Sequence, residues 1–181
     1  MRSTRYEPVQ ERILSAALPE PPCSRKRGKY DWLAVDVCAT AVAKQKSKLL
    51  SSRDVVALLL AASSLEARAT EHVVAIYVNA AMRPLAVSTL HKGGFASSMV
   101  DNAAIFQLGL LVGAVGFVLA HNHPSGSLEP SPQDDAFTRK LKESAPLVGL
   151  QLYDHIIIGG LPDSGQAKYF SYQDTGRFNT L

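Results

Sequence analysis

Residues 116–134 read GFVLAHNHPSGSLEPSPQD, and this stretch decides how the rest of the chain is interpreted. Its first five residues are apolar and predict a short buried strand, Gly116 to Ala120, which runs directly into His-Asn-His at 121–123. Side chains two positions apart in a strand point to the same side of a sheet. His121 and His123 can therefore present their imidazole nitrogens to a single cation.

The segment Ser131-Pro132-Gln133-Asp134 follows after seven further residues. It is typical of a helix start, with a serine cap, a proline at the first position and an acid three residues after the cap, and it predicts a helix from Ser131 to Glu143. The loop before it contains proline and glycine and can fold back, so that Asp134 can turn its free oxygen towards the histidines. An isolated histidine is more often structural, but two histidines and one carboxylate leave a fourth position for water, as in catalytic zinc sites. We therefore predict a Zn2+ site formed by His121, His123 and Asp134.

Strands and helices alternate on both sides of this stretch. Apolar and β-branched runs predict three further strands: His72 to Asn79, its hairpin partner Leu85 to Thr89, and Gln151 to Ile158. Two further helices are expected: one capped by Ser52 and running to Ala62, and an alanine-containing one from Met99 to Val112. This alternation predicts an α/β (α+β) layered domain over residues 51–181.

Residues 1–50 are interpreted as a separate N-terminal arm, broken by prolines at 19, 21 and 22, followed by a helix from Tyr30 to Lys46. Cys23 and Cys38 lack the C-x-x-C spacing of a zinc site. The net charge of +3 permits an acidic or nucleic-acid partner without arguing for one. We find no secretory signal and no apolar run of membrane-spanning length, and therefore expect no membrane association and a cytoplasmic location.

The metal pattern resembles that of the JAMM (JAB/MPN) metalloenzymes, in which a distant glutamate precedes H-x-H-x7-S-x-x-D. The local sequences HNHPSG, PSPQDDAFT and LYDHIIIGG are similar, more narrowly, to the RadC branch of that group. The resemblance covers roughly residues 51–175. It implies the deaminase-like JAMM fold, a mixed central β-sheet flanked by helices with one zinc ion at its edge.

The resemblance also implies roles for residues outside the ligand set. In these proteins a glutamate opens the strand that precedes the helix and the H-x-H strand, and Glu71, in TEHVVAIYVN, occupies that place as the expected general base. Glu66, in the polar linker SSLEARAT, is the nearest competitor. Ser131 is expected to donate a hydrogen bond to the developing oxyanion. His155 either orients the metal site from outside the ligand shell or is a satisfied structural histidine.

Two features of the RadC branch are missing from this sequence. Residues 1–50 contain no glycine hairpin of the helix-hairpin-helix type, which binds DNA in that branch. Asn102-Ala103-Ala104 stands where the branch usually has a Pro-Arg-Glu run. The second difference bears on the choice of substrate rather than on metal binding.

Three functions follow from these observations. The first is a zinc-dependent metallohydrolase of the metallopeptidase or isopeptidase type, acting on a protein or peptide. The second is a RadC-type, DNA-repair-associated nucleic-acid-binding protein or nuclease, whose basic residues between 25 and 48 contact phosphates. The third is a non-catalytic, zinc-stabilised binding module. The sequence has neither the G-x-S-x-G of serine hydrolases nor the P-C-x-x-C of zinc deaminases, which argues against those two chemistries.

Overall fold

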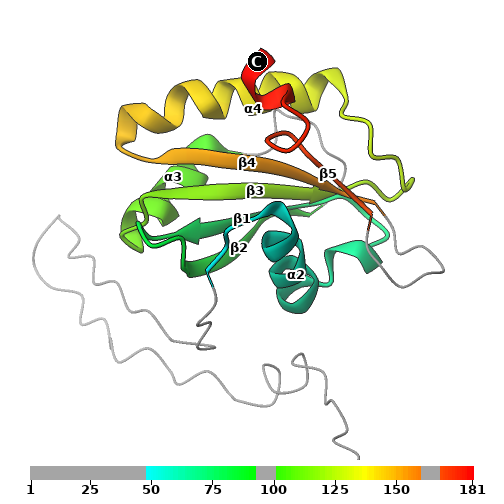
Figure 1. Cartoon of the computed structure of the whole chain (residues 1–181), viewed down its shortest axis with the longest axis horizontal. Coiled ribbons are helices and arrows are strands. Elements are labelled where there is room, and N and C mark those ends of the chain that lie inside the picture. The colour runs from blue at the N-terminus through cyan, green and yellow to red at the C-terminus, as the bar shows by residue number, and fades with distance from the viewer. Residues whose placement is uncertain (1–47, 93–100, 160–167) are drawn as a thin grey trace, which may run out of the picture. The chain divides into compact units, whose positions relative to one another are not determined.

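The computed structural model describes residues 48–92, 101–159 and 168–181, and within these ranges the chain forms one five-stranded sheet with helices on both faces (Figure 1). The strands lie in the order β2-β1-β3-β4-β5. Strands β3 and β4 run parallel, whereas the other three neighbouring pairs are antiparallel. The sheet is therefore mixed, as predicted.

The elements have the following bounds. The strands are β1 (His72–Val78), β2 (Pro84–Lys92), β3 (Gly116–Asn122), β4 (Gln151–Ile158) and β5 (Tyr169–Ser171). The α-helices are α2 (Ser52–Ser63), α3 (Asn102–Leu111) and α4 (Pro132–Ser144). Three 3-10 turns are η1 (Leu65–Ala67), η2 (Ala145–Val148) and η3 (Arg177–Thr180). Within the described ranges, no helix is long and apolar enough to cross a membrane.

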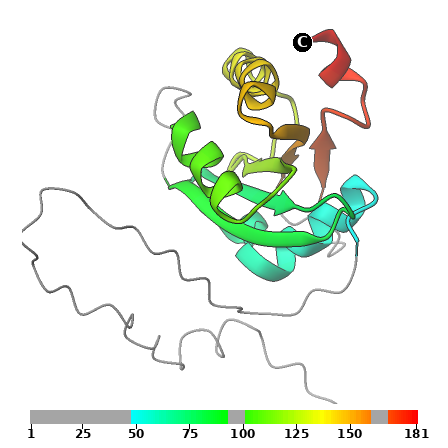
Figure 2. The ribbon, with the colours of Figure 1, turned by 90° about the vertical axis from the view of Figure 1, so that its left-hand side faces the viewer.

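Each face of the sheet carries its own hydrophobic core. Side chains of α3 and α4, including Ile105, Phe137 and Leu141, pack with one set of alternate strand residues. Side chains of α2, including Val56 and Leu59, pack with the other set. Figures 1 and 2 show α4 and α2 on opposite sides of the strands. The inner strands are buried on both faces, so β1 and β3 read as continuous apolar runs rather than as alternating ones.

A β-bulge in β4 determines which of its residues face α4. Phe117 of β3 pairs with Leu152, but the next residue, Val118, pairs with Asp154, so that Tyr153 is an extra residue on β4. An extra residue reverses the side to which all later side chains of the strand point. His155 therefore pairs with Leu119 and lies on the α4 face of the sheet.

Most of the predicted elements are confirmed, with small changes at their ends. Strand β3 continues two residues past Ala120, because its pairing with the neighbouring strands extends through the first histidine and Asn122. Strand β5, which pairs with the end of β4, was not predicted. The predicted helix at 30–46, the rest of the arm at 1–47, and the predicted start of α3 at Met99 lie outside the described residues.

One predicted cap is wrong. Ser51, not Ser52, caps α2, because its hydroxyl accepts from the amide of Asp54 while the Asp54 carboxylate accepts from the Ser51 amide. This reciprocal pairing requires the acid to lie three residues after the cap, and Asp54 is three residues after Ser51.

Candidate metal centre

Strand β3, the residue after it and helix α4 bring three side chains to one point. His121 lies near the end of β3, His123 directly follows that strand, and Asp134 lies in the first turn of α4. The Nε2 atoms of the two histidines are 2.9 Å apart, and Nε2 of His121 is 3.3 Å from Oδ1 of Asp134. One ligand atom from each residue lies within 4.8 Å of the others. The structure thus brings together the three predicted ligands, and this group could hold a metal ion.

Two of the three side chains are buried, and the third reaches the surface. The side chains of His121 and Asp134 are 0% and 1% exposed, whereas that of His123 is 12% exposed. A metal ion held here would therefore be reached by solvent or substrate from the side of His123. Catalytic metal sites keep such an open position, whereas structural ones are closed.

The carboxylate of Asp134 uses its two oxygens differently. The amide and the hydroxyl of Ser131 both donate to Oδ2, each at 2.7 Å, and the Ser131 hydroxyl accepts from the Asp134 amide in the predicted capping box. The other oxygen, Oδ1, is buried and has no hydrogen-bond partner among the described residues. A buried carboxylate oxygen without a donor is costly unless a cation neutralises it. This orphaned oxygen fits a bound metal ion.

The hydrogen bonding of His123 directs its other ring nitrogen at the same place. Its Nδ1 lies 2.9 Å from the carbonyl oxygen of Ser127. A carbonyl oxygen can only accept, so Nδ1 carries a proton, and Nε2 is the ring nitrogen left to bind a metal ion. Nε2 faces His121 and Asp134, and in its deprotonated form it would be the ligand atom.

The other side of His121 contacts a second histidine. Nδ1 of His121 is 2.8 Å from Nε2 of His155, and Nδ1 of His155 is 2.6 Å from the hydroxyl of Thr138 in α4. The His155 ring also stacks on Tyr172, with an interplanar angle of 8°. His155 therefore contacts His121 directly, and both of its ring nitrogens have partners, so its contacts fit both predicted roles.

Burial and charge set the protonation states of these groups. Burial lowers the pKa of His121 to about 4 and that of His155 well below its usual value, so both are neutral at neutral pH. A hydrogen bond with Asp134 raises the pKa of His123. Burial alone would raise the pKa of Asp134, but hydrogen bonds from His123 and Ser131 and the nearby His121 hold it well below its usual range. The centre therefore offers an ionised carboxylate between two imidazoles.

Glu71 directly precedes β1, beside the group. Its negative charge contributes to the raised pKa of His123, so the carboxylate lies within electrostatic reach of the centre. Glu66, the alternative base, lies in the preceding 3-10 turn η1. The role of Glu71 as general base stays a prediction.

Asn122, the residue between the two histidines, holds the backbone on both sides of Glu71. Its side chain points to the opposite face of the sheet, because neighbouring strand residues alternate. Its amide group donates to the carbonyl oxygens of Arg68 and Thr70, both at 3.1 Å, and its carbonyl oxygen accepts from the amide of His72 at 2.8 Å. Asn122 is buried, so these three bonds fix the segment that carries the acid.

A family comparison agrees with this geometry. Residues 49–177 match the model of the RadC-like JAB domain. The chain belongs to the RadC-like JAB domain family. Membership is consistent with a JAMM-related hydrolase or a RadC-type protein, and the RadC part of the sequence resemblance is confirmed.

Several curated relatives of this RadC-like chain carry the name UPF0758 protein. The relative from Flavobacterium johnsoniae is 38% identical over 103 residues, which is 57% of this chain and 42% of that protein. The one from Enterococcus faecalis is 36% identical over 131 residues, 72% of this chain and 53% of that protein. The one from Bacillus licheniformis is 40% identical over 106 residues, 59% of this chain and 45% of that protein. The RadC-like chain thus spans about half the length of the curated relatives it matches.

Sequence reasoning did not single out Thr138 and Asn122. Thr138 had a usable signal, because it lies four residues after Asp134 and therefore on the same face of α4. Asn122 had one as well, since strand alternation turns it away from the histidines and towards the segment before β1. Tyr172 had none, because it follows β5, which was not predicted.

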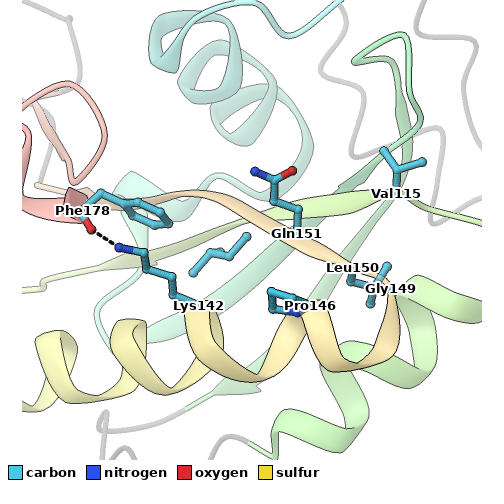
Figure 3. Close-up of a pocket in the computed structure, with 8 residues that line it drawn as sticks. Val115, Lys142, Pro146, Gly149, Leu150, Gln151 and Phe178 are labelled. Atoms are coloured by element: carbon cyan, nitrogen blue, oxygen red, sulfur yellow. Dashed lines mark hydrogen bonds between the residues drawn. The ribbon is translucent and has the colours of Figure 1, made fainter.

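A pocket in this RadC-like domain lies at the other end of the parallel strands. It has a volume of about 460 Å³, and its lining includes Val115, Gln151 and Phe178 (Figure 3). The ammonium group of Lys142 donates to the main-chain carbonyl oxygen of Phe178 at 2.6 Å. It also lies 4.9 Å from the centre of the Phe178 aromatic ring. The pocket adjoins the starts of β3 and β4, whereas the metal centre lies at the end of β3.

Proposed function

We propose that this chain is a zinc-dependent metallohydrolase that cleaves an amide bond, of the peptide or isopeptide type. The observation that carries the proposal is the convergence of two imidazole nitrogens and an orphaned carboxylate oxygen, with Glu71 in electrostatic reach. Two histidines and one carboxylate suit zinc, and an open side suits catalysis. The RadC-like JAB family supports the same reaction class.

Each residue has a defined task in this proposal. His121, His123 and Asp134 would hold the ion, and zinc when bound supplies Lewis-acid activation of a water molecule at neutral pH. The carboxylate of Glu71 accepts the proton of the attacking water and passes it to the leaving nitrogen. Asn122 keeps Glu71 in place through its three backbone hydrogen bonds.

Ser131 has an observed contact and a proposed one. Its hydroxyl donates to Oδ2 of Asp134 and so orients the carboxylate that would bind the metal. Donation to the developing oxyanion, which we propose from the JAMM resemblance, requires this hydroxyl to turn away from Asp134. Both tasks need the hydroxyl proton, so they belong to different steps of the reaction.

The test is cleavage of a peptide library by the purified chain, with and without a chelator. Glu71→Gln keeps the size of the side chain but cannot accept a proton, so it should retain zinc and lose hydrolysis by roughly 10²–10⁴-fold. Glu66→Gln is the matched control, because it makes the same chemical change in the neighbouring turn, and it should keep full activity. Loss of zinc from Glu71→Gln would mean that Glu71 is a ligand. Loss of activity only in Glu66→Gln would mean that Glu66, and not Glu71, is the general base.

A second candidate is a DNA-repair-associated role, as a nuclease or nucleic-acid-binding protein of the RadC type. It is favoured by the family and by the basic residues between 25 and 48, most of which lie outside the described residues. Binding of DNA that weakens steeply with salt would favour it. Salt-independent or absent binding, together with metal-dependent peptide cleavage, would favour amide hydrolysis. A non-catalytic zinc-stabilised module remains the third hypothesis and predicts zinc without cleavage.

A further inference from the structure

Three hydrogen bonds connect two of the proposed metal ligands, Asp134 and His121, through Thr138 and His155; we call these bonds the hydrogen-bond ring, because the two ligands meet again at the metal position. The hydroxyl of Thr138 is 2.6 Å from the main-chain carbonyl oxygen of Asp134 and 2.6 Å from Nδ1 of His155. Nε2 of His155 is in turn 2.8 Å from Nδ1 of His121. His121 and the Asp134 side chain then meet at the metal position, which closes the ring.

The direction of each bond in this ring follows from its starting point. The carbonyl oxygen of Asp134 can only accept, so the single hydroxyl proton of Thr138 points to it. The Thr138 oxygen must then accept from Nδ1–H of His155, because two bare lone pairs would otherwise face each other at 2.6 Å. A neutral His155 with its proton on Nδ1 has a bare Nε2, which accepts from Nδ1–H of His121.

We infer that Thr138 and His155 are positioning residues that hold His121 in the tautomer with Nδ1 protonated and the Nε2 lone pair directed at the metal position. This inference rests on the proposed function, since it concerns how the same site binds its metal. It deepens that function by assigning control of one ligand to two residues that do not bind the metal.

The surrounding packing supports a fixed ring rather than a chance contact. Thr138 and His155 are both fully buried, so their polar atoms have no water to replace a lost partner. The bulge at Tyr153 turns His155 to this face, and Tyr172 stacks flat on the imidazole of His155. Because the hydrogen-bond ring starts at the main chain of Asp134, it ties the orientation of His121 to the helix that carries the carboxylate.

The experiment compares Thr138→Val with Thr138→Ser. Valine keeps the shape of threonine but removes the hydroxyl, whereas serine keeps the hydroxyl and removes a methyl group. We expect Thr138→Val to weaken zinc binding about 10–100-fold, measured by competition with a chromophoric chelator, and to shift the visible absorption spectrum of the cobalt(II)-loaded protein. Thr138→Ser should bind zinc within about threefold of the unchanged protein, because the ring is intact.

Two further variants separate positioning from general loss of packing. Leu141→Val loosens the buried face of α4 one turn farther on, without touching the ring, and should leave zinc affinity and the cobalt spectrum unchanged. His155→Phe keeps a ring to stack on Tyr172 but removes both hydrogen bonds, and should reproduce the effect of Thr138→Val. It also provides the test if Thr138→Val does not fold.

The tautomer can be observed without any metal or substrate. Nitrogen-15 NMR of the metal-free protein should show His121 protonated on Nδ1, and the Nε2-protonated form in the unchanged protein would overturn the inference. Unaltered zinc affinity and cobalt spectrum in folded Thr138→Val and His155→Phe would also overturn it. If the unchanged protein bound no zinc, the proposed function would fail. The NMR measurement would still show by itself whether the hydrogen-bond ring holds His121 in the Nδ1-protonated tautomer.

Discussion

The two ends of the parallel pair β3–β4 differ in how their polar side chains are used. At the start of these strands, the ammonium group of Lys142 is satisfied by a carbonyl oxygen and by the Phe178 ring, beside an apolar pocket. At the end of β3, a buried oxygen of Asp134 is left without a donor and two imidazoles face it. Ligands of open α/β sheets bind outside the carboxyl ends of the strands.

This difference shows that the presence of a pocket does not by itself identify the functional site. The pocket is a concavity of about 460 Å³, but the one cation in its lining already has its partners. The metal centre contains a buried carboxylate oxygen without a hydrogen-bond donor, and its three residues could hold a metal ion. Changes at the metal end should therefore alter metal binding and catalysis, whereas changes at the pocket end should alter only stability.

The largest effect is expected from His121→Ala, His123→Ala or Asp134→Ala. Each variant removes one of three ligands and should weaken zinc binding by more than the roughly 100-fold that loss of an outer contact causes. Zinc content after desalting measures this. His72→Ala is the control, because its ring contacts the carbonyl oxygen of Thr70 instead, and it should keep its zinc. Full occupancy in any of the first three variants would show that its ligand is misassigned.

Asn122→Ala should have the next largest effect. It leaves the amide of His72 and the carbonyl oxygens of Arg68 and Thr70 without their partner, which should lower the free energy of unfolding by about 1–3 kcal/mol. Because the segment carries Glu71, hydrolysis should fall about tenfold or more while zinc content stays near that of the unchanged protein. Normal activity in the folded variant would show that the position of Glu71 does not depend on Asn122.

Asp154 lies on β4 beside His155 and should produce a pH dependence of stability. Burial raises its pKa to about 6, although the Ser171 hydroxyl and the amide of Gln173 donate to it. The folded state therefore binds more protons than the unfolded state between about pH 4 and 6, so stability should fall as the pH rises through this window, by about 2 kcal/mol.

Asp154→Asn tests this directly, because asparagine does not ionise. The difference in unfolding free energy between Asp154→Asn and the unchanged protein should vary from pH 4 to pH 6 and become constant above it. Denaturant titrations at several pH values give this difference. A constant difference across the whole range would mean that the burial of Asp154 does not shift its ionisation.

The smallest effect is expected at the pocket end. Lys142→Met keeps the apolar stem but removes the hydrogen bond and the ring contact, and should lower the free energy of unfolding by about 1 kcal/mol without changing zinc affinity. The exposed Lys140→Met on the same helix should change stability by less than about 0.5 kcal/mol. A loss of zinc affinity in Lys142→Met would contradict the separation of the two ends.

Local sequence patterns predicted most of the fold and the three candidate metal ligands. The apolar runs predicted β1, β3 and β4, and the serine-proline-acid pattern predicted the start of α4, because these signals span only a few neighbouring residues. The error at Ser52 was avoidable, since the acid at 54 identifies Ser51 as the cap. These features depend on short-range chemistry.

The arrangement around the ligands depends on register and could not be predicted. Nothing in the identity of Tyr153 shows that it is a bulge residue, yet this bulge turns His155 towards α4. Without it, strand alternation would place His155 on the opposite face of the sheet. The contact with Tyr172 likewise depends on the short strand β5, whose pairing is non-local.

The central claim is tested most directly by the zinc content of the purified chain. The protein is incubated with zinc, passed through a desalting column and analysed for metal and protein concentration. The account predicts about one zinc ion per chain, held by His121, His123 and Asp134, and much less in Asp134→Asn, which keeps the shape of the side chain but loses its charge. A zinc content near zero in the unchanged, folded protein would contradict the account.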